Sequence, residues 1–302
     1  MELRVLRYFL MAAREENITR AAEKLHITQP TLSRQLMQLE EDLGAALFHR
    51  NNHRIVLTED GILLKRRAQE LLELAEKTQR EFQSREELTG EIAIGCGETC
   101  NMASLSDWMA SFREQHPLIQ FRIRTAIADD VKERIEKGLL DMGLLLEPVE
   151  TPHYDSVRMP QKERWGALVR TDSPLAGMES LSPEELLRWP LLLPWRESVL
   201  SQVMGWFGEN RAKIQEAARF DFTFNAAIMV KHHMGVALCH DKGTAFFPNL
   251  RMVPLSPKLE NGAVLAWKKD LPRSRAVEQF IAHIKNTAAS MEMPEKHCLD
   301  TN

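Results

Sequence analysis

Apolar positions in the first part of the chain recur with the period of short helices. From 3 to 15 they follow the i, i+3, i+4, i+7 spacing of one buried helical face. A second helix follows, with Asn17 or Thr19 able to cap it. A third begins after Thr28 and has Pro30 in its first turn, where a missing N–H costs nothing. Short helices joined by a tight turn predict a helix-turn-helix.

The third helix has a polar outer face, and a hairpin follows it. Residues 47–50 and 54–57 flank the turn 51–53, which predicts a wing. Amide, hydroxyl and guanidinium groups can pair with base edges or phosphates, and a proline ring can meet a thymine methyl. The candidate DNA contacts are Gln29, Pro30, Thr31, Ser33, Arg34 and Gln38 on the helix, and Arg50, His53 and Arg54 on the wing. The alternative is a solvated helix face and an ordinary basic turn.

A long helix is expected from Thr58 to about Ser84, and it would be about 39 Å long. Its apolar positions are spaced four, three, four, three and four residues apart, which is a heptad pattern. That pattern consists of Leu64, Ala68, Leu71, Ala75, Thr78 and Phe82. An isolated helix with such a seam needs a partner, so we expect a dimer. The alternative is that the seam packs onto its own chain.

Past Thr89 and Gly90 the pattern changes to short apolar strands that alternate with helices. This alternation predicts α/β units with a largely parallel sheet. The first group of strands includes 92–94, 121–123 and 142–146. A second group starts near 164 and includes 165–169, 191–193, 220–224 and 236–238. The fold class is therefore α/β, with an N-terminal all-α winged helix-turn-helix.

Composition agrees with a soluble protein of two or three domains. The chain has 302 residues, of which 44% are apolar and 27% charged. No run approaches the roughly 20 apolar residues of a membrane helix, and the first ten residues do not read as a signal peptide. We therefore expect the cytoplasm. The net charge of −4 does not exclude DNA binding, because a small module can carry its own positive patch.

The N-terminal residues resemble the signature of LysR-type transcriptional regulators. Many positions match in order and with the right spacing over about 55 residues. These are Phe9, Ala21, Ala22, Leu25, Gln29, Pro30, Thr31, Leu32, Ser33, Leu39, Glu40, Leu43, Gly44, Leu47, Phe48, Arg50, Leu57, Thr58 and Gly61. Further along, the resemblance is one of length and α/β layout.

The resemblance implies a winged helix-turn-helix at 1–58, a dimerising linker helix and hinge at 59–90, and an effector-binding regulatory domain at 91–302. That domain would resemble periplasmic solute-binding proteins, with two α/β lobes joined by two crossovers around an effector cleft. Lobe I would comprise about 91–161 and 267–302, and lobe II about 162–266. The resemblance also implies homotetramers on an interrupted inverted repeat of double-stranded DNA near a promoter, with RNA polymerase as a further partner to consider.

Residues at strand ends and helix starts are the candidates for the effector cleft. They are Cys96, Thr99, Cys100 and Thr125 in lobe I, and Trp195, Arg196 and Asn225 in lobe II. Trp195 could form a wall for a planar ligand. For each residue the alternative is a loop cap or core packing. We expect a small-molecule effector of unknown identity and no cofactor.

Three other functions compete with DNA-binding regulation as explanations of the sequence. Cys96 and Cys100 could sense oxidants if a helix start lowers a thiol pKa. A transport solute-binding protein would leave the first 58 residues without a purpose. An enzyme is not predicted, because Gly-x-Ser-x-Gly, P-loop and Gly-x-Gly-x-x-Gly motifs are absent from the sequence. No metal site is predicted around Cys239, His232, His233 and His240, because adjacent histidines on a helix point in different directions.

Overall fold

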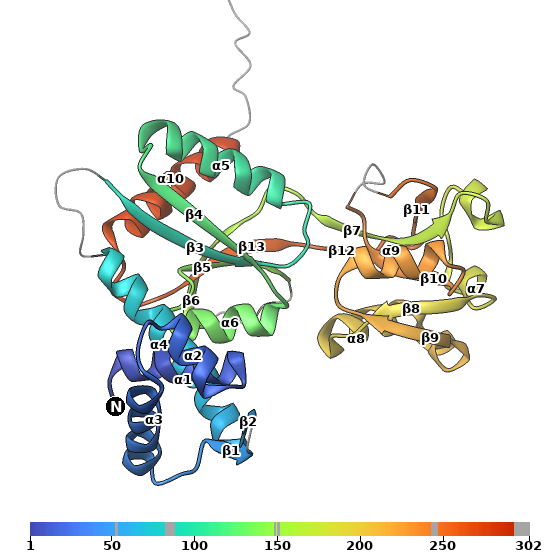
Figure 1. The fold of residues 1–302 in the computed structure, drawn as a ribbon. Helices are drawn as coiled ribbons and strands as arrows, with labels where there is room; N and C mark the ends of the chain where they lie inside the picture. The colour runs from blue at the N-terminus through green and yellow to red at the C-terminus, as the bar shows by residue number, and fades with distance from the viewer. Residues whose placement is uncertain (52–53, 82–87, 148, 150–151, 243–246, 293–302) are drawn as a thin grey trace, which may run out of the picture. The chain divides into compact units, whose positions relative to one another are not determined.

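The structure is a computed structural model that describes residues 1–51, 54–81, 88–147, 149, 152–242 and 247–292 (Figure 1). The chain divides into two compact units, Met1–Glu86 and Glu87–Asn302. We call them unit 1 and unit 2.

Unit 1 contains the three predicted helices, the predicted hairpin and the start of the long helix. Its elements are α1 (Leu3–Glu15), α2 (Ile18–Lys24), α3 (Gln29–Leu43), β1 (Phe48–Asn51), β2 (Arg54–Leu57) and α4 (Glu59–Glu81). The two strands pair antiparallel from Phe48 opposite Leu57. Asn17 is the residue that caps α2, since its side chain accepts a hydrogen bond of 3.0 Å from the Arg20 amide. The winged helix-turn-helix expected from the sequence is confirmed.

The core of unit 1 is built from the inward faces of its helices. Phe9 on α1 and Leu32 and Leu36 on α3 have no exposed surface. The ring of Phe9 lies 5.3 Å from that of Phe48, so the hairpin packs on the first helix. The helix α4 adds Ala68 and Leu72 to the same core.

The expected seam on α4 is only partly correct. Leu64 and Ala68 do face an apolar core, but it is the core of their own unit. The next buried residue is Leu72, whereas Leu71 remains 40% exposed. A straight helix has 3.6 residues per turn, so its buried face drifts relative to a 3.5-residue repeat. The buried residue after Ala68 is therefore four positions further along, at Leu72, and not three positions further along, at Leu71. Phe82 lies outside the described residues.

Unit 2 consists of two α/β lobes. Lobe I has a five-stranded sheet in the order β4-β3-β5-β13-β6. Its elements are β3 (Gly90–Cys96), α5 (Met102–Gln115), β4 (Ile119–Thr125), α6 (Ala128–Glu136), β5 (Met142–Leu146), β6 (Tyr154–Arg158), β13 (Ala263–Lys268) and α10 (Arg275–Glu292). Helices α5 and α10 cover one face of this sheet and α6 covers the other (Figure 1).

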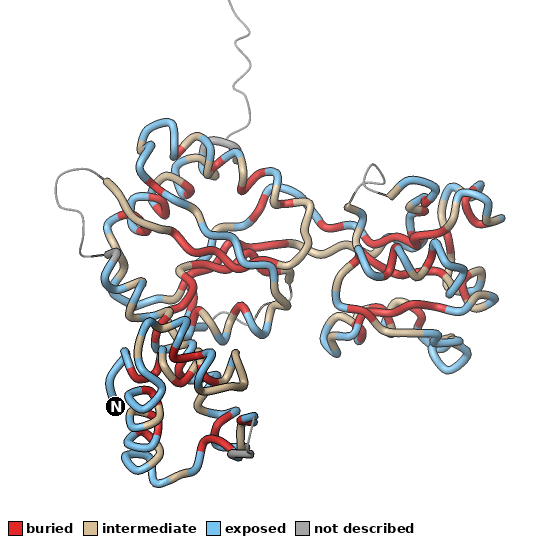
Figure 2. The backbone as a smooth tube through the Cα atoms, viewed as in Figure 1, coloured by how far each residue is buried: buried red, intermediate tan, exposed pale blue. Residues whose placement is uncertain are grey.

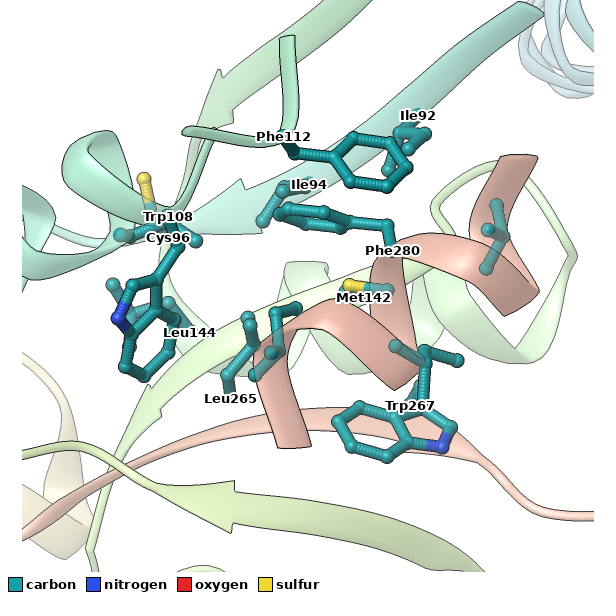
Figure 3. Close-up of a cluster of buried hydrophobic side chains, with 14 of the residues drawn as sticks. Ile92, Ile94, Cys96, Trp108, Phe112, Met142, Leu144, Leu265, Trp267 and Phe280 are labelled. Carbon is teal, nitrogen blue, oxygen red and sulfur yellow. The ribbon is translucent and has the colours of Figure 1, made fainter. Parts of the chain in front are cut away.

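Aromatic residues fill the core between the sheet of lobe I and helices α5 and α10. The rings of Phe112 and Phe280, one from each helix, lie 5.1 Å apart (Figure 3). Trp108 and Trp267 are also buried there. The central strands run through the buried interior of the lobe (Figure 2).

Lobe II has a second sheet in the order β11-β7-β10-β8-β9, with the short β12 on β7. Its strands are β7 (Glu163–Arg170), β8 (Pro190–Pro194), β9 (Gln215–Phe220), β10 (Val236–His240), β11 (Leu250–Pro254) and β12 (Glu260–Asn261). Its helices are η1 (Pro174–Gly177), α7 (Pro183–Leu186), α8 (Glu197–Phe207), η2 (Gly208–Lys213) and α9 (Thr223–Lys231). Alternate residues of β8 pack to opposite faces, Leu191 and Leu193 in the core that includes α8, and Leu192 in the core that includes α9.

Two expectations for unit 2 are corrected by the strand pairing. Both sheets are mixed rather than largely parallel, because β13 runs antiparallel to β5 and β6, and β7 runs antiparallel to β10 and β11. Since β13 already belongs to the sheet of lobe I, the chain returns to that lobe at Ala263 rather than at 267.

The expected strand 220–224 is also wrong. Strand β9 ends at Phe220, and helix α9 begins at Thr223. The alternation of phenylalanine and polar residues there resembles a strand, but the Thr223 amide donates to a distant carboxylate and starts a helix. Asn225 is therefore a helical residue.

None of the described helices combines the length and the hydropathy needed to cross a membrane.

We predict that Phe9→Ala lowers the free energy of unfolding of unit 1 by about 3–5 kcal/mol, because it empties a site with no exposed surface. Leu3→Ala is the matched control in the same helix, since Leu3 is 44% exposed, and should cost about 0.5 kcal/mol or less. Urea unfolding followed by circular dichroism measures both. Equal losses in the two variants would contradict the packing described.

Candidate DNA-binding surface and ligand cavity

Helix α3 exposes most of the predicted polar side chains. Gln29, Pro30, Thr31, Arg34 and Gln38 are exposed, and Ser33 is half-buried. The Thr28 side chain does not cap the helix, and its hydroxyl instead pairs with that of Thr31 at 2.8 Å. The first turn of α3 contains no acidic residue, so its positive helix end is uncompensated.

Arg34 and Gln38 differ in how they are held. The Gln38 amide donates to Asp42 at 3.1 Å. Over the described parts of both units, the Arg34 guanidinium has no hydrogen-bond or ion-pair partner. An exposed and uncommitted guanidinium can form a bidentate pair with a base edge or bind a phosphate.

The wing contributes one described cationic side chain. Arg54 forms an ion pair with Glu16, at the end of α1, and its Nε donates to Glu16 at 2.7 Å. The backbone of Arg50 pairs with Ile55. The side chain of Arg50 and the whole of His53 lie outside the described residues. Arg54 would therefore have to share its guanidinium between Glu16 and DNA, or leave Glu16 to contact DNA.

Unit 2 contains a cavity of about 140 Å³ lined by residues of both lobes. Aromatic and aliphatic walls dominate it, including Trp165, Trp195, Phe220, Leu144 and Val199. Of the residues predicted from the sequence, Trp195 and Arg196 line this cavity. Trp195 is 62% exposed, so it is available to a ligand.

The other predicted cleft residues lie elsewhere. A second and larger cavity, of about 530 Å³, is lined by Cys96, Thr99, Cys100 and Thr125. Glu98 and Lys242 line both cavities. Asn225 lines neither of them and is exposed on α9. The predicted residues are therefore divided between two adjoining cavities, except for Asn225.

Arg196 is held by a carboxylate of the opposite lobe. Its Nε and Nη2 donate to the two oxygens of Asp129 at 2.8 and 2.7 Å. The hydrogen bond from Arg196 lowers the pKa of Asp129. This bidentate pair joins the start of α8 to the start of α6.

Glu163, the first residue of β7, is completely buried and heavily hydrogen-bonded. Its Oε1 accepts from the Thr99 hydroxyl and from Asn101 Nδ2 at 2.9 Å, and its Oε2 accepts from Lys242 Nζ at 2.9 Å. The Cys100 thiol donates to it at 3.1 Å. Burial alone would raise the pKa of Glu163. The charge of Lys242 and these hydrogen bonds together outweigh burial and lower the pKa to about 2. The carboxylate is therefore ionised.

A second carboxylate also joins the lobes, but this one belongs to lobe I and accepts from lobe II. Glu98, in the loop after β3, accepts a hydrogen bond of 2.6 Å from the Thr223 amide at the start of α9. The residues predicted from the sequence include its neighbours Cys96, Thr99 and Cys100 but not Glu98 itself. No local sequence pattern identifies either acid, because their hydrogen-bond partners are distant in the chain. Thr99 lies 64 residues from Glu163, and Thr223 lies 125 residues from Glu98.

Asn261 and His240 are polar residues that line the 140 Å³ cavity. Asn261 accepts from Trp165 Nε1 at 2.7 Å and donates to the side chain of Gln202 at 2.7 Å. The His240 ring lies 4.2 Å from the Trp165 ring. Burial and the charge of Lys242 lower the pKa of His240 to about 4, so the imidazole is neutral near pH 7.

The three described cysteines are free thiols whose pKa values are all raised. Burial raises the pKa of Cys96 and of Cys239, the latter to about 12. Burial and the Glu163 carboxylate raise the pKa of Cys100 to about 11. Reactive thiols need a lowered pKa, so these environments disfavour a redox role. Cys298 lies outside the described residues.

Comparisons with known proteins match the N-terminal and the C-terminal parts of the chain to two family models. Residues 3–62 match the family model "Bacterial regulatory helix-turn-helix protein, lysR family", and residues 85–289 match "LysR substrate binding domain". The Hca operon transcriptional activator HcaR of Escherichia coli is 29% identical over 301 residues, covering 96% of this chain and 99% of HcaR.

Solved structures show the same fold. The chain aligns with full-length CbnR in complex with its target DNA at a TM-score of 0.78 and 21% identity, over 95% of this chain and 100% of CbnR. It aligns with HinK, a LysR family transcriptional regulator from Pseudomonas aeruginosa, at a TM-score of 0.56 and 25% identity, over 96% and 99%.

We predict that the native thiols of Cys96 and Cys100 react slowly with iodoacetamide at pH 7 and faster as the pH rises. With a pKa of about 11, roughly one Cys100 thiol in ten thousand is ionised at pH 7. Peptide mass spectrometry after timed labelling measures each site, and the chain unfolded in urea is the control in which all thiols react. Rapid modification of either native thiol at pH 7 would contradict the environments described.

Proposed function

The chain belongs to the LysR family of DNA-binding transcriptional regulators, and we propose that it binds an interrupted inverted repeat near promoters under the control of a small-molecule effector. Unit 1 would supply DNA recognition, and the 140 Å³ cavity of unit 2 would hold the effector. The relatives are transcriptional regulators, and we do not propose a catalytic activity. The protein would act in the cytoplasm, with the DNA.

The observation that carries this proposal is the exposed polar face of α3. Its first turn presents amide and hydroxyl groups, and Arg34 lies one turn further along, exposed and without a partner in the described chain. In helix-turn-helix proteins the start of the second helix enters the major groove, where such side chains read base edges. The remaining predicted contacts, on the wing, would bind phosphates.

The cavity of unit 2 supports the effector half of the proposal. It lies where residues of two lobes meet, it is mainly apolar, and a few polar side chains converge on it. These are the general properties of small-molecule sites. A ligand that binds one arrangement of the lobes more tightly than another would shift the population of the regulator.

Helix α4 supports a homodimer. Its residues Leu63, Leu71 and Leu74 are 57%, 40% and 40% exposed. At about 100° per residue the three side chains fall within about 80° of one another, so they form one apolar stripe. We propose that two copies pair through this stripe and that dimers assemble further into a homotetramer. RNA polymerase would be the partner through which DNA binding changes transcription.

We predict that Arg34→Ala weakens specific DNA binding by roughly 1–3 kcal/mol, because it removes the exposed guanidinium from α3. The measurement is a mobility-shift titration on the DNA upstream of the protein's own gene at fixed salt. Arg113→Ala is the matched control, since Arg113 is an exposed arginine on α5 of unit 2. Unchanged affinity of the Arg34 variant would remove this residue from the interface.

We predict that the double variant Leu71→Glu and Leu74→Glu is monomeric at concentrations where the natural chain is dimeric. Charges on the apolar stripe would be buried without partners in the dimer. Sedimentation velocity measures the assembly state. Gln69→Glu is the control, because Gln69 is an exposed residue on another side of α4. A double variant that sediments like the natural chain would show that the stripe is not the contact.

A further inference from the structure

Four helices of unit 2 begin next to the two cavities, and each of their N-termini meets an acidic side chain. Helix α6 carries Asp129 and Asp130 in its own first turn, and α8 carries Glu197. Helices α5 and α9 have no acid in their first turns. A helix N-terminus with free amides is a ready site for an anionic ligand. Only α5 and α9 could therefore offer such a site.

Both of these helix starts are occupied by carboxylates from distant parts of the chain. At α5, the Glu163 carboxylate accepts from the amides of Cys100 and Asn101 at 3.5 and 3.4 Å, in addition to the Thr99 hydroxyl. At α9, Glu98 accepts from the Thr223 amide. A ligand carboxylate would have to displace one of these internal carboxylates.

The cations around the cavity are also committed. Among the described residues that line the 140 Å³ cavity, the lysine and arginine side chains are Arg196 and Lys242. Arg196 is paired with Asp129, and Lys242 with Glu163. The same lining contains three acids, Glu98, Glu147 and Asp221. The acids of the lining, together with the two carboxylates that pair with Arg196 and Lys242, thus outnumber the two cations. The electrostatic potential in the cavity therefore disfavours an anion.

We infer that the effector carries no anionic group, and that Glu163 determines this specificity by pairing Lys242, one of the two cations that line the 140 Å³ cavity, and by holding the start of α5 beside it. This inference rests on the proposed function, which makes the cavity the effector site. The ligand class is an apolar ring compound with an amine or hydroxyl substituent. Trp165 and Trp195 would contact the ring, and an amine would be attracted both to the exposed Trp195 face and to the acidic lining.

The first test removes the internal carboxylate from the full-length chain and supplies it again from solution. Glu163→Ala deletes a CH₂–COO⁻ group, which acetate can replace. We expect the variant to melt roughly 5 °C or more below the natural chain, because it leaves Lys242, whose side chain is only 14% exposed, without its carboxylate. Acetate at 50 mM, about the range for a weak site, should restore at least half of that loss. Acetamide should not, since it carries no charge.

Glu260→Ala is the matched control, because Glu260 is a crossover carboxylate paired with Lys162 and Arg164 but not placed at a helix start. Acetate should leave this variant and the natural chain within about 1 °C of their buffer values. If Glu163→Ala does not fold, Glu163→Gly replaces it, since it also vacates the carboxylate position, and the expected result is again a preference for acetate over acetamide. Equal effects of acetate and acetamide, or stabilisation of the natural chain by acetate, would overturn the inference.

The second test determines the ligand class with benzylamine, benzyl alcohol and benzoate, which share one ring and differ in charge. Calorimetric titration of the natural chain should detect the amine or the alcohol and bind benzoate at least tenfold more weakly. Benzoate should gain at least tenfold in Glu163→Ala. Benzoate binding the natural chain as tightly as the other two, or no binding of the amine and the alcohol, would overturn the ligand class. Failure of the natural chain to shift its own upstream DNA would instead overturn the proposed function.

Discussion

The two lobes of unit 2 are joined around a carboxylate that has no contact with water. Glu163 is ionised and completely buried, and a buried charge is tolerated only when it is paired and hydrogen-bonded. Its partners come from the loop after β3 in lobe I and from Lys242 after β10 in lobe II. Because Asn101 also donates to the Gln161 carbonyl at 2.9 Å, the same loop holds the chain just before it enters lobe II. The geometry of this crossover therefore depends on the partners of one side chain.

The second crossover is tied to the first and to the cavity. Asn261 is paired with Glu163 across β12 and β7, and its side chain contacts Trp165 and Gln202, which line the cavity. Its Nδ2 also donates to the Glu147 carbonyl at 2.9 Å. A ligand that moves Trp165 or Gln202 would thus act directly on a residue that connects both crossovers. This gives a physical route by which occupancy of the cavity changes the balance between lobe arrangements, without requiring a change inside either lobe.

The parts that could be predicted from the sequence are those whose determinants lie within a few residues. Phe9 and Leu36 are buried because their spacing places them on the inward faces of amphipathic helices, and Asn17 caps α2 through an amide three residues away. The prediction was wrong where a distant contact decides the local structure. Residues 220–224 alternate like a strand, yet Glu98 caps a helix at Thr223. Leu71, by contrast, fits the heptad and is exposed on the single chain, which leaves it available to a partner helix, whereas Leu72 packs in the core of unit 1. The exposed position of Asn225 follows from the same unexpected helix.

The same distinction explains why DNA recognition and ligand recognition differ in how far a sequence reveals them. The polar face of α3 is a property of one helix, so the residue types alone indicate what it can bind. The charge of the cavity is a property of pairs. Arg196 by itself suggests a site for anions, but Asp129, 67 residues away, neutralises it. Thr99 at a helix start suggests the same, but its hydroxyl donates to Glu163, 64 residues away. The sign of the ligand that a cleft accepts therefore depends on the pairs formed in folding. Here both cations of the lining, Arg196 and Lys242, are paired with carboxylates, while aromatic side chains remain in the wall.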